Sequence, residues 1–236
     1  LDGLPATGRH PLKHLVFDKN HNIVLNIGAP TDRCEATSSN LSSQRIPCPE
    51  IAGARPQAAL WLVTMEWPAG KVKSVAPLAA GLRNSMALAV HPRSGLLLQG
   101  ENSIDLEPDD EPPEELNVIV AGKNYGWPYC TGDNRRLPTL GPRNIECDAF
   151  EKPAVLMPGH AAPLGMLYYD GPMFPELKGK LVIGAHGYRA NGQRIVAYDV
   201  AADGRPTQPG NRQRPLYPLE LAAGWGLLQG VRPAVK

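Results

Sequence analysis

Short apolar runs alternate with polar turns along most of this chain, and the 3.6-residue periodicity of amphipathic helices is almost absent. The first pair of runs covers residues 14–17 and 23–27, with the polar segment 18–22 between them. The same pattern returns at residues 86–90 and 95–98, and less regularly at 164–169 and 180–184. Two apolar runs joined by a polar segment are typical of antiparallel hairpins. The pattern therefore predicts an all-β protein.

Two further strands are expected at residues 59–63 and 194–198, each followed by a polar turn that contains glycine. Paired strands that recur about every 70–80 residues favour a β-propeller with long insertions, and a β-sandwich is the alternative. Three to four blades are recognisable, which is fewer than closure usually needs. We therefore expect residues 1–236 to form a single propeller domain that is truncated or incompletely represented at both ends.

Composition narrows the class of protein but not its activity. Of the 236 residues, 42% are hydrophobic and 20% are charged, as in folded globular proteins. The 24 Lys and Arg residues nearly balance the 23 acidic residues, so no net field attracts nucleic acid or anionic lipid. No stretch approaches the roughly 18 apolar residues of a membrane span. A membrane span, a coiled coil and a basic nucleic-acid binder are excluded.

Four cysteines form two pairs that are local in sequence. No Cys-x-x-Cys occurs, so the signatures of zinc and c-type haem are missing. Closing loops of about 14 and 17 residues would stabilise the fold by roughly 3 kcal/mol each. We expect the disulfides Cys34–Cys48 and Cys130–Cys147, and hence a periplasmic or secreted protein. The alternative is four buried free thiols in a cytosolic protein.

A run of acidic residues stands at positions 105–115, where seven carboxylates are interrupted by three prolines. The prolines predict a loop and not a helix face. Such a run is either a solvated loop or a site for a hard cation such as Ca²⁺, which prefers carboxylate and carbonyl oxygens. Its spacing is not that of an EF-hand loop.

Several short motifs resemble one family of enzymes. They are Gly8-Arg9-His10, Gly81-Leu82-Arg83-Asn84, Glu114-Glu115-Leu116-Asn117, Asn124-Tyr125-Gly126-Trp127-Pro128, His160-Ala161-Ala162-Pro163-Leu164-Gly165 and Gly184-Ala185-His186-Gly187. Together they resemble the soluble sugar dehydrogenases that depend on pyrroloquinoline quinone (PQQ), in particular the sorbosone or aldose sugar dehydrogenase branch, and are similar to soluble quinoprotein glucose dehydrogenase. The resemblance covers roughly residues 5–233.

The resemblance implies a six-bladed β-propeller with PQQ at the mouth of its axial channel, here apparently incomplete. The implied activity is oxidation of a sugar or sugar aldehyde at C1, with hydride transfer to the quinone and electrons passed to a cytochrome c or a quinone. His10 is then the catalytic base, a role that suits an imidazole with an ordinary pKa near 6.5. A surface histidine in a loop is the alternative. Arg83 would stabilise the reduced cofactor.

Further residues around PQQ are implied in the same way. The cofactor contacts would be Arg83, Asn84, Asn102, His160, His186 and Arg189, with Arg194 as a possible substitute for Arg189. One Ca²⁺ would bind backbone carbonyls at Asn102 and Ser103, although residues 99–103 lack the Gly-Pro pair of the glucose-oxidising branch. A structural Ca²⁺ would bind Glu115 and the carbonyl of Tyr125.

Two other functions compete with the dehydrogenase. One is a non-catalytic propeller that contains calcium and binds a glycan or a protein, since fold does not imply function. The other is a calcium-dependent lactonase, which would need axial carboxylates from several blades. The combination of His10, Arg83 and cations at 186–189 favours the dehydrogenase.

Overall fold

Antiparallel strands dominate the computed structural model, which describes residues 1–35, 47–108, 110–137, 144–207 and 219–220. The first sheet has the order β1 (Leu15–Phe17), β2 (Ile23–Ile27), β3 (Ala59–Glu66), β4 (Lys71–Ala80). The second has the order β10 (Val155–Met157), β7 (Glu114–Val118), β6 (Leu97–Glu101), β5 (Ala87–Val90). The third has the order β11 (Pro163–Tyr168), β12 (Leu181–Ala185), β13 (Arg194–Tyr198), β14 (Leu219–Glu220). A ribbon of β8 (Cys130–Thr131) and β9 (Arg135–Arg136) is inserted between β7 and β10.

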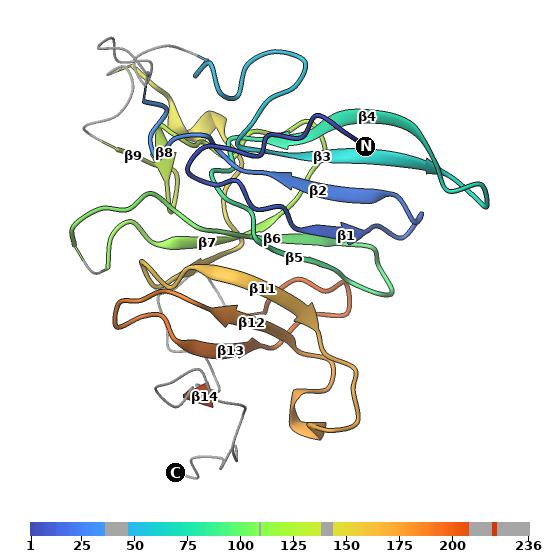
Figure 1. Ribbon diagram of the computed structural model, residues 1–236. Helices are drawn as coiled ribbons and strands as arrows, with labels where there is room; N and C mark the ends of the chain where they lie inside the picture. The colour runs from blue at the N-terminus through green and yellow to red at the C-terminus, as the bar shows by residue number, and fades with distance from the viewer. Residues whose placement is uncertain (36–46, 109, 138–143, 208–218, 221–236) are drawn as a thin grey trace.

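The three four-stranded sheets lie one against the next, with β5 in contact with both β1 and β11 (Figure 1). Helical structure in the described part of the chain is limited to the 3₁₀ turns η2 (Cys147–Ala149) and η3 (Pro175–Leu177). No helix among these residues is long and apolar enough to cross a membrane. The all-β prediction is confirmed, whereas no sheet in the described ranges closes on itself.

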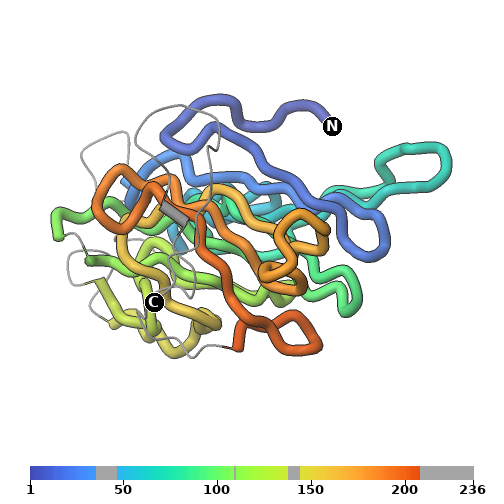
Figure 2. The backbone as a smooth tube through the Cα atoms, turned by 90° about the horizontal axis from the view of Figure 1, so that it is seen from below, coloured from blue at the N-terminus to red at the C-terminus, as the bar shows by residue number. Residues whose placement is uncertain are grey.

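The predicted hairpins are confirmed, because β1 pairs with β2, β5 with β6 and β11 with β12. The strand expected at residues 59–63 is longer than its apolar run and pairs with β4 in a hairpin that projects from the rest of the molecule (Figure 2). Seven of the ten residues of β4 are exposed because this hairpin extends beyond its neighbours. The sequence also predicts the start of another strand near residues 230–236, but these positions lie outside the described residues.

Apolar side chains fill the spaces between adjacent sheets. Leu60 of β3, Leu88 of β5 and Leu82 form one cluster, with no more than 1% of each residue exposed. Leu116 of β7 and Ile183 of β12 belong to a second cluster, which joins the second sheet to the third. Alternation along the strands directs these residues into the interfaces between sheets.

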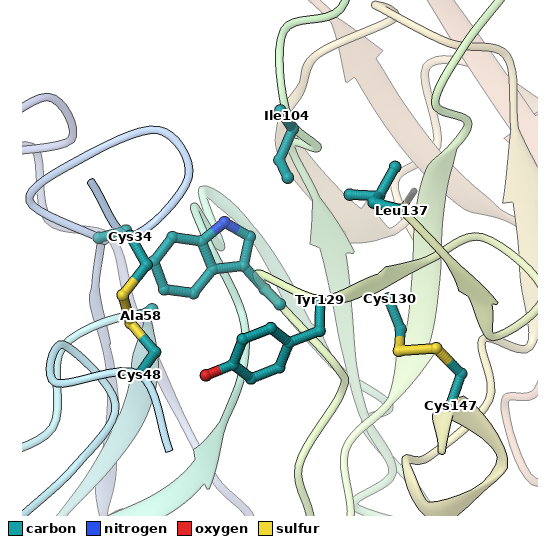
Figure 3. Close-up of a cluster of buried hydrophobic side chains, with 10 residues drawn as sticks. Cys34, Cys48, Ala58, Ile104, Tyr129, Cys130, Leu137 and Cys147 are labelled. Atoms are coloured by element: carbon teal, nitrogen blue, oxygen red, sulfur yellow. A yellow bond between two sulfur atoms is a disulfide. The ribbon is translucent and has the colours of Figure 1, made fainter. Parts of the chain in front are cut away.

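Both predicted disulfides are present, Cys34–Cys48 and Cys130–Cys147. They belong to one buried cluster, and the ring of Tyr129 lies between them (Figure 3). Trp127 is a member of the same cluster. Two loops that are far apart in sequence are thereby joined through a single apolar core.

The acidic run is only partly the loop that its prolines predict. Glu114 and Glu115 begin β7, with 1% and 5% of their surface exposed. Backbone N–H groups allow this burial: Glu114 accepts from Ser103 at 2.5 Å and Glu115 from Gly132 at 2.6 Å. Position 109 lies outside the described residues. The prolines at 112 and 113 therefore end the loop directly before a buried strand.

Candidate functional site

Arg83 lies at the centre of the candidate site, three residues beyond the end of β4. Only 2% of the surface of Arg83 is exposed to solvent. Nε and Nη2 donate to Oδ1 of Asp32 at 2.8 and 2.5 Å, and Nη1 donates to the carbonyl of Asn102 at 2.7 Å. Nη2 also approaches Asp105 at 3.3 Å. A buried guanidinium needs such partners, because an unpaired charge in the interior is strongly destabilising.

His10 is held beside this arginine by a hydrogen bond from Nδ1 to the carbonyl of Ala29, at 2.8 Å. A carbonyl only accepts, so Nδ1 carries the proton and Nε2 keeps its lone pair. Burial, followed by the positive charge of Arg83, lowers the pKa of His10 to about 4. The imidazole is therefore neutral at pH 7. Ala29 also donates its N–H to the carbonyl of Arg83 at 2.8 Å, so one residue anchors both groups.

Asp105 connects Arg83 to the segment that leads into the third sheet. It accepts from Nη2 of Arg9 at 2.8 Å and lies 4.0 Å from Nδ1 of His160. Although burial acts in the opposite direction, the hydrogen bond from Arg9 and the charge of Arg83 lower the pKa of Asp105. Nη1 of Arg189 in turn lies 3.1 Å from Nε2 of His160.

These residues form what we call the charge cluster, defined as Arg9, Asp32, Arg33, Arg83, Asp105, His160 and Arg189. Four arginines face two aspartates within it, so the cluster carries an excess of positive charge. A concentration of guanidinium groups is suited to carboxylate or phosphate groups of a ligand.

Sequence reasoning implied that His160, His186, Arg189 and Asn84 contact a cofactor, and the structure places only some of them together. His160 and Arg189 lie in the charge cluster, where His160 contacts the carbonyl of Pro108 at 2.9 Å and Arg189 donates to that of Glu107 at 2.9 Å. Both therefore anchor the acidic loop.

The other implied residues lie at the edge of this arrangement or outside it. His186 is exposed, and its backbone N–H donates to Ala162. Asn84 is buried, with its N–H 3.2 Å from Oε1 of Glu101. Arg194 donates through Nε to the carbonyl of Gly192 at 3.2 Å.

A second feature is a half-open cavity of about 10 Å³, lined by residues of β6, β7 and β8 and of the segments that follow β4, β6 and β7. Such a volume is close to what one water-sized particle needs. Its lining includes Glu101, Ser103, Glu115 and Tyr125. Two buried glutamates thus line one small space, together with three residues that carry hydroxyl groups, Ser103, Tyr125 and Thr131.

Burial and neighbouring carboxylates disfavour the ionised form of both glutamates at this cavity. Burial, followed by the charge of Glu115, raises the pKa of Glu101 to about 8. Burial also raises the pKa of Glu115 to about 7, against the hydrogen bond from Asn117. A divalent cation would relieve both effects, because it supplies the positive charge that this space lacks.

The expected metal ligands fit a cation only in part. Among the described residues, no group of three or more His, Cys, Asp or Glu side chains is placed to hold a metal ion. The carbonyl of Asn102 already accepts from Arg83, whereas Ser103, Glu115 and Tyr125 all line the cavity. A cation there would depend on backbone or side-chain oxygens besides the two carboxylates, which Ca²⁺ accepts.

Sequence reasoning missed Asp32, Asp105 and Glu101 as site residues. Asp32 is 8% exposed and holds Arg83, yet in the sequence it is one carboxylate in a polar turn before Cys34. Asp105 stood within the acidic run without being distinguished from its neighbours. Glu101 ends an apolar strand, where a carboxylate is unexpected, and that position was the available signal.

Comparisons with known proteins identify the family of this chain. A sequence model of the glucose/sorbosone dehydrogenase family matches residues 5–211. The aldose sugar dehydrogenase YliI of Escherichia coli (strain K12) is 28% identical over 193 residues, which are 76% of this chain and 46% of that protein. The chain thus spans about half the length of that relative.

Solved structures show the same fold. A Trichoderma reesei enzyme of carbohydrate-active family AA12 superposes with a TM-score of 0.64 at 18% identity. The holo form of the PQQ domain of pyranose dehydrogenase from Coprinopsis cinerea superposes with a TM-score of 0.60 at 19% identity. Each match covers 86% of this chain and 56% of the other chain. The chain belongs to the glucose/sorbosone dehydrogenase family, with the fold of the PQQ-dependent glucose dehydrogenase propellers.

Proposed function

We propose that this chain is part of a PQQ-dependent dehydrogenase that oxidises a sugar or sugar aldehyde at C1. The observation that carries the proposal is the neutral imidazole of His10 beside a buried arginine, at the edge of a cluster with excess positive charge. Family membership gives the general activity, and the residues of the charge cluster fit an anionic cofactor. PQQ, when bound, supplies a quinone that accepts a hydride.

The base in this proposal is Nε2 of His10. Its other nitrogen is committed to the carbonyl of Ala29, so only Nε2 can take the proton of a substrate hydroxyl. Burial keeps the imidazole neutral over the whole physiological range of pH. When Nε2 takes the hydroxyl proton, the electrons of the O–H bond can form the carbonyl bond, and the C1 hydrogen would leave as hydride with both electrons of the C1–H bond.

Arg83 and the exposed arginines have different roles in binding. Arg83 is fixed by Asp32, so its positive charge stays in one place while negative charge develops nearby. The side chain of Arg9 is 52% exposed, which leaves it able to reach a ligand carboxylate. Arg189, between His160 and the acidic loop, would be the corresponding cation on the third sheet.

In this proposal, Ca²⁺ would bind in the cavity that Glu115 and Tyr125 line. Glu101 and Glu115 would bind the ion through carboxylate oxygens, and Ser103 would add a third oxygen. We expect that Ca²⁺ raises the melting temperature of the native chain, and that Glu115→Gln removes the increase. Glu176→Gln, in the exposed turn η3, is the control that should keep it.

The remaining parts of the proposal concern the whole protein. The three sheets would be three blades of a six-bladed propeller, in keeping with coverage of about half of the related proteins. A cytochrome c or a quinone would take up the electrons. The two disulfides support a periplasmic or secreted location, since such bonds persist in oxidising compartments.

Reconstitution with PQQ and Ca²⁺, followed by dye-linked oxidation of a panel of aldoses and sugar aldehydes, tests the proposal. His10→Asn should lower kcat/KM at least a hundredfold, because a positioned general base typically contributes about 10²–10⁴-fold to the rate. His21→Asn is the matched control, since His21 lies in an exposed turn with a φ of 60°, which asparagine tolerates. Folded chain that neither binds PQQ nor oxidises any sugar would instead support a non-catalytic propeller.

A further inference from the structure

Trp127 bonds to the backbone of both segments that carry the buried ion pair of the candidate site. Its indole Nε1–H donates to the carbonyl of Asp32 at 3.1 Å. Its backbone N–H donates to the carbonyl of Gly81 at 3.1 Å, two residues before Arg83. The first contact holds the residue that supplies the carboxylate, and the second holds the segment that supplies the guanidinium.

The segment around Trp127 is fixed against the end of β4 over several residues. Tyr125 donates its N–H to the carbonyl of Ala80 at 3.0 Å, and Ala80 donates to Lys123 at 3.1 Å. Gly81 has a φ of 72°, and a Cβ there would lie 2.0 Å from Oδ1 of Asn124. The two segments therefore run side by side, at a distance that only glycine permits.

The packing around Trp127 makes this contact rigid. Trp127 is 5% exposed and lies in the buried cluster that contains both disulfides. Cys34, two residues after Asp32, belongs to the same cluster. The backbone of Asp32 is thus held by an indole on one side and by a covalent cross-link close behind it, so its carboxylate has little freedom to follow Arg83 if Arg83 moves.

We propose that Trp127 is a positioning residue that fixes the geometry of the Arg83–Asp32 pair beside His10. Trp127 bonds to both segments, and it thereby helps to set the distance between them together with the bond from Ala29 to Arg83. The position of the guanidinium relative to the imidazole then depends in part on Trp127. The inference itself rests on contacts of the structure, and only its catalytic consequence rests on the proposed function.

The test compares Trp127→Phe with Trp61→Phe in the ¹⁵N-labelled chain. Both tryptophans are buried and donate an indole N–H to a backbone carbonyl. Trp61, however, belongs to a different buried cluster and donates to Pro56. The readout is hydrogen exchange of the Nε–H of Arg83, with its signal assigned through Arg83→Lys. We expect exchange at least tenfold faster in Trp127→Phe and within twofold of the unaltered chain in Trp61→Phe.

Two results would overturn the inference. One is unchanged exchange at Arg83 in Trp127→Phe, and the other is equal acceleration of the backbone amides of β6, which would make Trp127 a general packing residue. Should Trp127→Phe fail to fold, benzothienylalanine at position 127 keeps the shape of the ring and removes only the N–H donor, and the same readouts apply.

Activity gives a second readout that separates the two proposals. With PQQ and Ca²⁺, kcat/KM should fall at least tenfold in Trp127→Phe and stay within twofold in Trp61→Phe. An unaltered chain without activity would count against the proposed function, while exchange at Arg83 would still decide the role of Trp127. Activity that is unaffected by Trp127→Phe, despite faster exchange, would show that the positioning does not serve catalysis.

Discussion

Replacing Asp32 by asparagine should cost this protein a large part of its stability. The change removes a carboxylate that is 8% exposed and leaves its partner Arg83, 2% exposed, with an uncompensated charge. Removing one member of a buried ion pair typically costs about 3–5 kcal/mol. The amide oxygen of the new side chain would still accept one hydrogen bond, and Asp105 remains 3.3 Å away, so we expect a loss of about 3 kcal/mol.

The matched control is Asp105→Asn, which removes the other carboxylate beside the same guanidinium. The side chain of Asp105 is 41% exposed, so water screens its interaction with Arg83. Its loss should cost no more than about 1 kcal/mol. Equilibrium urea unfolding at pH 7 measures both values, and equal m-values would show that the two variants unfold between comparable states.

A second readout separates charge from packing. Asp32 raises the pKa of His10 and Arg83 lowers it, so Asp32→Asn should lower the pKa of His10 further, as measured by NMR titration of the imidazole. A loss of stability below about 1 kcal/mol, or one equal to that of Asp105→Asn, would refute the reasoning. Either result would mean that Arg83 finds other partners or water when position 32 carries no charge.

Two more predictions concern backbone conformation and pH. Gly81→Ala should lower the free energy of unfolding by more than about 2 kcal/mol, because a Cβ is disfavoured by the φ of 72° and would also collide with the neighbouring segment. Gly70→Ala has a similar φ of 65° with open space around it and should cost only about 1 kcal/mol in the same urea unfolding experiment. For His10, the folded protein takes up the proton only near pH 4, whereas the unfolded chain takes it up near pH 6.5. Stability should therefore fall as the pH drops from 6.5 to 4, by about 3 kcal/mol from this group, and His10→Asn should flatten that part of the profile. A profile that is the same with and without His10 would contradict the assigned burial.

The sequence by itself determined three of the strand pairs. Alternating apolar and polar positions can be satisfied by hairpins with one face buried, so β1–β2, β5–β6 and β11–β12 follow from local chemistry. The disulfides were predictable for a related reason, since each joins cysteines that are close in sequence. Short stretches with recognisable residues, such as the one around Arg83, were sufficient to indicate the family.

Only the tertiary structure decided which charges meet. Asp32 and Arg83 are 51 residues apart, and Arg9 and Asp105 are 96 residues apart, so no local pattern marks them as partners. Carboxylates of the same acidic run also differ in exposure and surroundings. Asp105 is half-exposed among arginines, whereas Glu115 is buried beside a cavity. A carboxylate's pKa and its partners depend on burial and on segments brought close by packing of the sheets, and neither quantity is encoded in the spacing of residues along the chain.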